Sequence, residues 1–214
     1  MDDRLSSSLS LDAALDRLQR RIAGLNRKQA TVLFAVCGNA LLPFYEKFVA
    51  KSGWGDISIL RRAAAFAAGY AVGEVSEKED SKLLLNEIAT VVPDGERFDA
   101  PGSTFAQDAA ICLDAAVRTT NPNESFNPAW IEYVLEPATQ IAAEEQTGYL
   151  DLGTTDEGKR WRQQALTHPG LFRAYQTIWQ LIDIVEVRQT FRRDELAEME
   201  TMVGKSLMPE TRQE

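Results

Sequence analysis

Apolar residues recur every three or four positions along almost the whole chain. Near the start the series is Leu11, Leu15, Leu18 and Ile22, and comparable series continue into the last quarter of the sequence. This spacing places the apolar side chains on one face of an α-helix. No segment shows a sustained alternation of apolar and polar residues, which is the pattern typical of a half-buried β-strand. The sequence therefore predicts an all-α fold.

Breaks in the apolar series divide the chain into seven or eight predicted helices. Gly and Pro cluster at the breaks, as in the segments 53–55 and 168–170. Pro43 falls inside the second predicted helix, where proline is expected to kink or split it. The last predicted helix is the longest and runs from about residue 171 to 203. The predicted N-caps are Ser10, Asp56 or Ser58, Ser76 with Glu79 as a capping box, Ser103 or Thr104, Asn127 before Pro128, and Thr154 or Thr155.

The predicted loops are short, and no linker stands out between the helices. At 214 residues the chain is long enough for one large hydrophobic core or for two small ones. Because no boundary is visible, we expect one compact bundle: a single all-helical domain over residues 1–214. The ends, residues 1–9 and 205–214, are expected to be flexible.

Negative charge is concentrated in the middle of the chain. Residues 74–157 contain 18 Asp and Glu against 4 Lys and Arg, whereas the whole chain has a net charge of −9. A field of this sign repels nucleic acid and attracts a basic partner. We therefore expect no nucleic-acid partner and a basic protein as the partner.

The expected compartment is the cytoplasm. The N-terminus has no basic segment followed by an apolar segment, so it does not resemble a secretory signal. No apolar run approaches the length of about 18 to 20 residues that a membrane span needs. The two cysteines, Cys37 and Cys112, both lie in apolar helical stretches. They either form a disulfide or are two small buried side chains in a reducing compartment, and their surroundings favour the second interpretation.

The sequence contains no familiar catalytic motif. It lacks the Gly-x-Ser-x-Gly of serine hydrolases, the phosphate-binding Gly-x-x-x-x-Gly-Lys and the dinucleotide-binding Gly-x-Gly-x-x-Gly. His168 is the one histidine, and it precedes Pro169 at a helix break, which favours a capping or turn role over general-base chemistry. We therefore expect no catalytic residue, no metal and no cofactor.

Carboxylates suggest two further candidate sites. Asp94, Glu96 and Asp99 fall within one short loop, but they lack the length and ligand order of an EF-hand. Asp108 and Asp114 are six residues apart, or about 240° around a helix, so they do not converge on one acid–base site. We interpret the loop carboxylates as part of an acidic binding surface rather than as a metal site.

Trp130 lies at the N-terminus of an acidic predicted helix and is expected to be exposed there. Aromatic side chains beside acidic ones are typical hot spots for basic partners. The predicted partner-binding residues are Asp94, Glu96, Asp99, Trp130, Glu132, Glu136, Glu144 and Glu145.

Several short motifs occur in a characteristic order in residues 11–120. They are the segment Leu18 to Leu25, the leucine-proline-aromatic segment Leu41 to Tyr45, Gly55-Asp56, Pro93-Asp94, and the Ala-rich segment from Asp108 to Ala116. This part of the chain resembles the YjaG-like family of bacterial proteins of unknown function. It departs from the family pattern at Arg27-Lys28-Gln29 and at Gly38-Asn39. The resemblance implies a compact all-helical fold and implies no particular reaction.

The sequence favours a non-enzymatic protein-binding module. An acidic helical protein without catalytic motifs fits an immunity protein or antitoxin that neutralises a basic toxin, such as a nuclease, by occluding it. The alternative is a YjaG-like housekeeping protein that binds a small molecule in a helical pocket.

Overall fold

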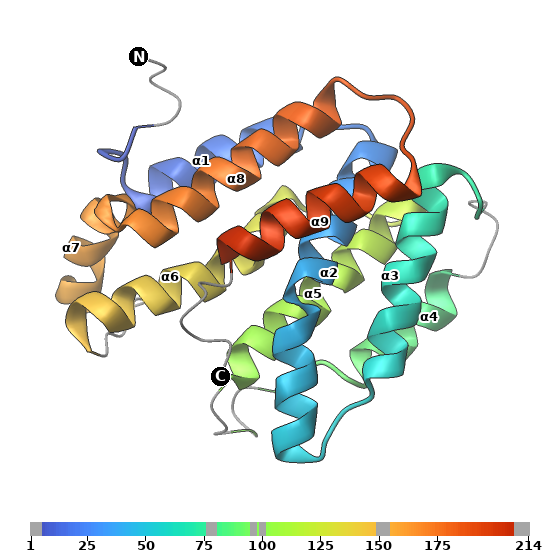
Figure 1. The fold of residues 1–214 in the computed structure, drawn as a ribbon, viewed down its shortest axis with the longest axis horizontal. Helices are drawn as coiled ribbons and strands as arrows, with labels where there is room; N and C mark the ends of the chain where they lie inside the picture. Colours follow the sequence, from blue (N-terminus) through green and yellow to red (C-terminus); the bar gives the residue numbers. More distant parts are fainter. Residues whose placement is uncertain (1–5, 76–80, 95–97, 99–101, 149–154, 208–214) are drawn as a thin grey trace.

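The computed structural model describes residues 6–75, 81–94, 98, 102–148 and 155–207. Every regular element within these ranges is helical, which confirms the all-α prediction (Figure 1). In chain order the α-helices are α1 (Leu11–Ile22), α2 (Arg27–Ser52), α3 (Ile57–Val72), α4 (Ser81–Ala89), α5 (Ser103–Thr120), α6 (Ile131–Thr147), α7 (Asp156–Gln164), α8 (Pro169–Glu186) and α9 (Arg193–Leu207). Two short 3-10 helices, η2 (Pro128–Trp130) and η3 (Ala165–Thr167), precede α6 and follow α7.

The long helices α2 and α5 form the centre of the fold. Figure 1 shows α3 and α4 on one side of this pair and α1, α6, α7 and α8 on the other, with α9 crossing α2. Because α2 has neighbours on several sides, almost every residue between Gln29 and Leu42 is buried. Cys37 on α2 and Cys112 on α5 are both free and fully buried, as the apolar interpretation predicted.

One helix in the described ranges, α2, is long and apolar enough to cross a membrane by length and composition. The sequence pattern predicts no membrane span here, because polar residues interrupt the apolar run of this segment. In the structure 67% of its most apolar window is buried among the other helices. Its apolar composition is therefore accounted for by its central position in the bundle.

Side-chain caps fix most helix starts where the sequence predicts them. Ser10 accepts a hydrogen bond from the backbone N–H of Ala13, and Asp56, Asn127 and Thr155 cap α3, η2 and α7 in the same way. The start of α5 differs, because Gly102 occupies the N-cap position and no side chain caps it. The predicted capping box at Ser76 lies outside the described residues.

Pro43 does not divide the second predicted helix. The structure has a single helix, α2, with Pro43 inside it. Proline removes one backbone hydrogen bond from a helix interior at a cost of about 3 kcal/mol. The extensive burial of α2 among its neighbours offsets that loss, which local sequence rules do not include.

The last predicted helix is two helices, which gives nine α-helices in the described ranges instead of seven or eight. The chain leaves the helix after Glu186 and starts α9 at Arg193. The buried side chain of Gln29 donates hydrogen bonds to the carbonyl oxygens of Val185, Glu186 and Arg188 at 2.9–3.2 Å. It thereby satisfies carbonyls that a continuing helix would have bonded internally.

The predicted flexible ends are only partly described. Residues 1–5 and 208–214 lie outside the described ranges, whereas residues 205–207 belong to α9. The side chain of Leu207 is fully buried, so the helix extends beyond the predicted start of the flexible end. The single-domain organisation of the whole chain remains a prediction.

Candidate functional site

Four of the predicted partner-binding residues lie on α6. They are Glu132, Glu136, Glu144 and Glu145. At 3.6 residues per turn, the first and last of them point in directions about 140° apart. The four carboxylates therefore spread around the outer side of the helix and do not form one compact acidic patch.

The partners of these carboxylates are mostly neutral. Glu132 accepts a hydrogen bond from Gln19 at 2.7 Å, and Glu136 accepts one from Gln140 at 3.0 Å. Within the described part of the chain, neither of the two pairs with a lysine or arginine. Their charges are therefore not neutralised internally, which leaves them available to a basic partner.

The remaining predicted residues fall elsewhere. Asp94 is exposed and lies in the segment after α4, while Glu96 and Asp99 are outside the described residues. Trp130 is half-buried rather than exposed, because its ring packs edge-on against Phe34 and Phe126, with centroids 6.2 and 6.4 Å apart. Trp130 therefore belongs to the edge of the core, and the expectation that it stands free is wrong.

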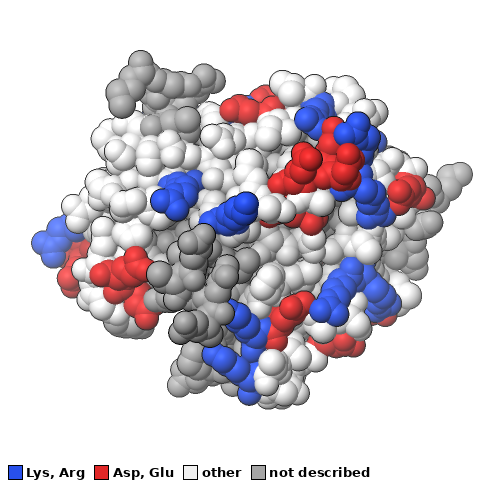
Figure 2. Space-filling view, viewed as in Figure 1, with Lys and Arg blue, Asp and Glu red and all other residues white. Residues whose placement is uncertain are grey.

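Other carboxylates of the acidic middle segment are paired with arginines. The pairs are Asp114 and Glu124 with Arg118, Glu87 with Arg62, and Glu74 with Arg193. Figure 2 shows acidic and basic side chains close together on the face in view. Arg118 belongs to the acidic segment itself, whereas folding brings Arg62 and Arg193 to it from other parts of the sequence. These two outside residues reduce the local field that the sequence alone suggests.

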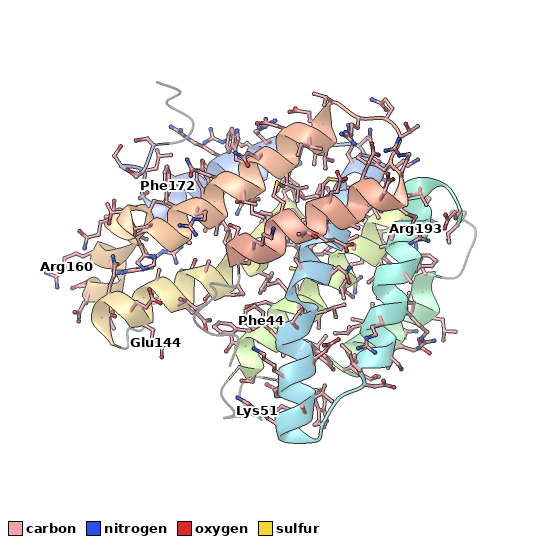
Figure 3. All side chains as sticks on the ribbon, viewed as in Figure 1. Phe44, Lys51, Glu144, Arg160, Phe172 and Arg193 are labelled. Carbon is pink, nitrogen blue, oxygen red and sulfur yellow. The ribbon has the colours of Figure 1, made fainter. Side chains whose placement is uncertain are left out.

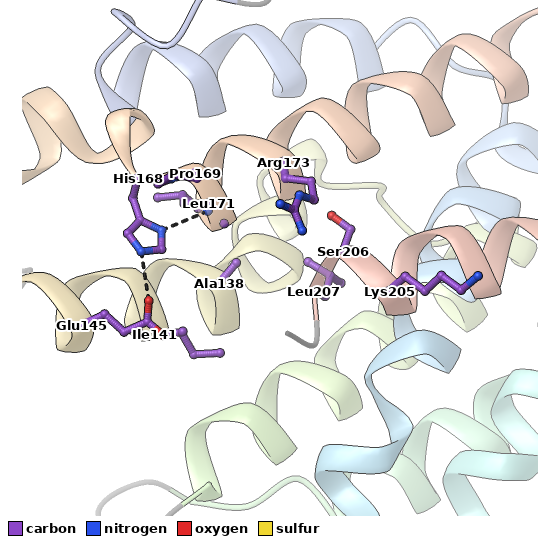
Figure 4. Close-up of a pocket in the computed structure, with 11 residues that line it drawn as sticks. Ala138, Ile141, Glu145, His168, Pro169, Leu171, Arg173, Lys205, Ser206 and Leu207 are labelled. Carbon is purple, nitrogen blue, oxygen red and sulfur yellow. Dashed lines mark hydrogen bonds and ion pairs between the residues drawn. The ribbon is translucent and has the colours of Figure 1, made fainter. Parts of the chain in front are cut away.

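A pocket of about 340 Å³ opens where α6, the start of α8 and the end of α9 meet (Figure 4). Its walls combine apolar side chains with a small set of polar ones. From α6 come Ala138, Ile141 and Glu145, from the start of α8 residues 168–171 and Arg173, and from α9 residues 205–207. A concave site of this size with a few converging polar groups is typical of small-molecule sites.

His168 and Glu145 form one end of this pocket. The Nδ1 atom of His168 caps α8 by accepting the backbone N–H of Leu171 at 3.3 Å. A neutral ring in that role carries its proton on Nε2, which donates to the Glu145 carboxylate at 3.0 Å. The capping role predicted for His168 is confirmed, and both ring nitrogens are occupied by protein partners (Figure 4).

Arg173, Ser206 and Lys205 form the other end of the pocket. Figure 4 shows the Arg173 guanidinium and the Ser206 hydroxyl facing each other between α8 and α9, while the ammonium group of Lys205 points away. The Ser206 Oγ atom is buried and has no hydrogen-bond partner. Neither cation forms an ion pair with any other described residue. This end of the pocket therefore presents unsatisfied donors.

Asp108 is a second unusual group, on the buried face of α5. Its side chain is 2% exposed, and its Oδ2 atom has no hydrogen-bond partner. Burial, and secondarily the charge of Glu136, raise the pKa of Asp108 to about 9. Asp114 instead pairs with Arg118, so the two aspartates have different surroundings on α5.

Sequence reasoning found part of the pocket and missed the rest. Glu145 and His168 were singled out, although Glu145 was assigned to a protein interface. Arg173, Lys205 and Ser206 carried no signal, because each stands alone in an ordinary amphipathic helix. Only the meeting of three helices places them together.

The helices build a fold that is also found in a family of unknown function. The structure is similar to the crystal structure of a DUF416 family protein from Shewanella baltica OS155, with a TM-score of 0.66. The similarity covers 86% of this chain and 92% of that chain at 16% sequence identity. Comparison with protein-family models and with curated protein sequences finds no match.

Proposed function

We propose that this protein binds a small molecule in the pocket between α6, α8 and α9. The observation that carries the proposal is the set of polar groups without protein partners, Arg173 and Ser206, on the wall of a partly apolar pocket. The Ser206 hydroxyl is buried, and buried polar groups normally find hydrogen-bond partners. Arg173 is exposed and has no acidic partner among the described residues. A ligand in the pocket could complete both groups. In this proposal the protein acts as a non-enzymatic binding protein in the cytoplasm. Membership of the YjaG-like family, suggested by the motifs in residues 11–120, is part of the same proposal.

A thermal-shift screen against a library of small metabolites tests the proposal. A compound that binds the folded state raises the melting temperature in proportion to its affinity and concentration. The variant Ala138→Phe places a ring in the pocket, and Ala64→Phe makes the same change in a separate hollow between α2, α3 and α9. We expect compounds that stabilise the wild type and Ala64→Phe but not Ala138→Phe. Compounds that stabilise all three equally would show that the pocket is not the binding site.

A second candidate function is the binding of a basic protein, as an immunity protein or antitoxin binds a toxin. The observation in its favour is that Glu132 and Glu136 on α6 accept hydrogen bonds only from glutamines. The test is an affinity pull-down from native cells at low and high salt. Reversal of Glu132, Glu136, Glu144 and Glu145 to lysine is expected to slow association about tenfold or more, since charge steers the encounter. Unchanged association kinetics would exclude α6 as the docking surface.

A further inference from the structure

Among the described residues, two of the basic side chains without an acidic or carbonyl partner, Arg173 and Lys205, line the pocket. Many arginines elsewhere are paired, among them Arg21 with Asp183 and Glu186, Arg162 with Asp12, and Arg188 with Glu195. The exposed Arg160 on α7 forms no ion pair within the described residues. Arg27 donates instead to three backbone carbonyls. Arg173 has no comparable partner among the described residues, although the protein carries an excess of acidic side chains.

The second hollow of the molecule provides a contrast. It has a volume of about 310 Å³ and is also lined by two arginines, Arg61 and Arg193. Each of these is held by a carboxylate, Arg61 by Glu46 at 2.8 Å and Arg193 by Glu74 at 2.5 Å. An arginine beside a hollow is therefore not distinctive in this fold. The α6–α8–α9 pocket differs because Arg173 has no carboxylate partner and lies beside the buried, unpartnered hydroxyl of Ser206.

The two ends of the α6–α8–α9 pocket differ in chemistry. Glu145 at one end already accepts the His168 proton, and its negative charge repels a second anion. Arg173 and Ser206 at the other end offer donors that face each other (Figure 4). The buried side chains of Ala138, Ile141 and Leu171 provide an apolar wall. A ligand that satisfies this arrangement has one anionic group and an apolar body.

We propose that the ligand class of this pocket is a small organic carboxylate. Its carboxylate accepts hydrogen bonds from the Arg173 guanidinium and the Ser206 hydroxyl, and its hydrocarbon body lies against Ile141 and Leu171. The planar guanidinium matches a carboxylate with two parallel N–H donors, which gives both strength and orientation. This inference rests on the proposed function and specifies the chemistry of its ligand.

Four probes separate charge from hydrophobicity. Hexanoate carries both features, hexanol lacks the charge, hexylammonium reverses it, and inorganic phosphate is an anion without an apolar body. Each is titrated into isotope-labelled protein while backbone amide chemical shifts are followed. We expect hexanoate to perturb residues 171–173 and 205–207 at lower concentration than the other three probes.

Arginine variants complete the test. Arg173→Gln is expected to weaken hexanoate binding about tenfold, because it removes the charge-assisted pair. Arg160→Gln changes the net charge by the same amount at an exposed position on α7, where Figure 3 shows the side chain pointing outward, and is expected to leave binding unchanged. Ser206→Ala is expected to weaken binding to a smaller degree.

The outcomes distinguish this inference from the proposed function. The carboxylate assignment would be overturned if hexanol bound as tightly as hexanoate, or if Arg173→Gln and Arg160→Gln had the same effect on hexanoate binding. The proposal that the pocket binds a small molecule would not be affected by either result. Phosphate binding as tightly as hexanoate would overturn the requirement for an apolar body. If no probe perturbs residues 171–173 and 205–207 but Ala138→Phe abolishes the stabilisation by library compounds, the carboxylate assignment fails. The proposal that the pocket binds a small molecule is then still supported. If the library compounds also fail, both proposals fall.

Discussion

Gly38 on α2 lies directly against Leu113 on α5. A Cβ atom at position 38 would be 2.8 Å from the Cγ and Cδ2 atoms of Leu113 and 3.1 Å from its backbone nitrogen. Real Cβ atoms essentially never lie within 3.0 Å of another heavy atom, so Leu113 can occupy this place without a shift only because position 38 is glycine. The α2–α5 packing at the centre of the fold depends on this glycine.

Substitution Gly38→Ala tests this relationship. Alanine is favoured over glycine inside a helix by roughly 0.8–1 kcal/mol, whereas overpacking in a core typically costs about 1–3 kcal/mol. We expect a net decrease in the free energy of unfolding, measured by urea denaturation. The control Ala50→Gly, at an exposed position of α2, reports helix propensity alone. A Gly38→Ala variant more stable than the wild type would show that the helices separate without cost.

The cap at the start of α8 is a second test. His168→Ala removes the acceptor for the Leu171 N–H, and loss of an N-cap costs about 1 kcal/mol. His168→Asn retains a side-chain acceptor at the cap and loses only the contact with Glu145. We therefore expect His168→Ala to be the less stable of the two variants in thermal denaturation. Equal stability would mean that the contact with Glu145, and not the cap, holds the histidine.

Asp108 predicts a pH-dependent stability. With a pKa of about 9, the folded protein retains a proton that the unfolded chain releases above about pH 4. Unfolding thus releases a proton between these values, and the contribution of Asp108 to stability decreases as the pH rises from about 4 to about 9. Asp108→Asn cannot ionise and is expected to be more stable than the wild type at pH 8, by about 1–3 kcal/mol.

Denaturant titrations from pH 5 to pH 9 check this prediction. The difference between Asp108→Asn and the wild type should grow as the pH rises, because ionisation of Asp108 stabilises the unfolded wild-type chain while the buried carboxyl stays protonated in the folded protein. Asp16→Asn makes the same chemical change at an exposed site on α1, and its difference from the wild type should stay small across the range. Parallel profiles for Asp108→Asn and the wild type would contradict a buried, protonated Asp108.

Cys37 and Cys112 give a direct measure of core burial. Both side chains are fully buried, and burial raises the pKa of both thiols, so little of the reactive thiolate forms. We expect no reaction with Ellman's reagent in the native protein and reaction of both thiols after denaturation. Rapid labelling without denaturant would show that the α2–α5 contact opens.

The predictable part of the fold is local. The apolar series from Leu11 to Ile22 and the cap residues Ser10, Asp56 and Thr155 identify helices because caps and periodicity involve only neighbours in sequence. The division of the last helix was missed, because its cause is Gln29, more than 150 residues earlier, which captures the carbonyls at the end of α8. Likewise, Arg62 and Arg193, which lie outside the acidic segment in the sequence, pair with Glu87 and Glu74 of that segment, and a count along the sequence does not include them.

The sequence by itself determined the all-α class, most helix starts and the capping role of His168, since each follows from side chains acting on the backbone beside them. Only the tertiary structure decided where charges balance and where a pocket forms. Arg173 and Ser206 are 33 positions apart in the sequence and carry no motif. They meet because buried faces of α8 and α9 pack against the same core, and burial is a property of the assembled helices rather than of any one segment.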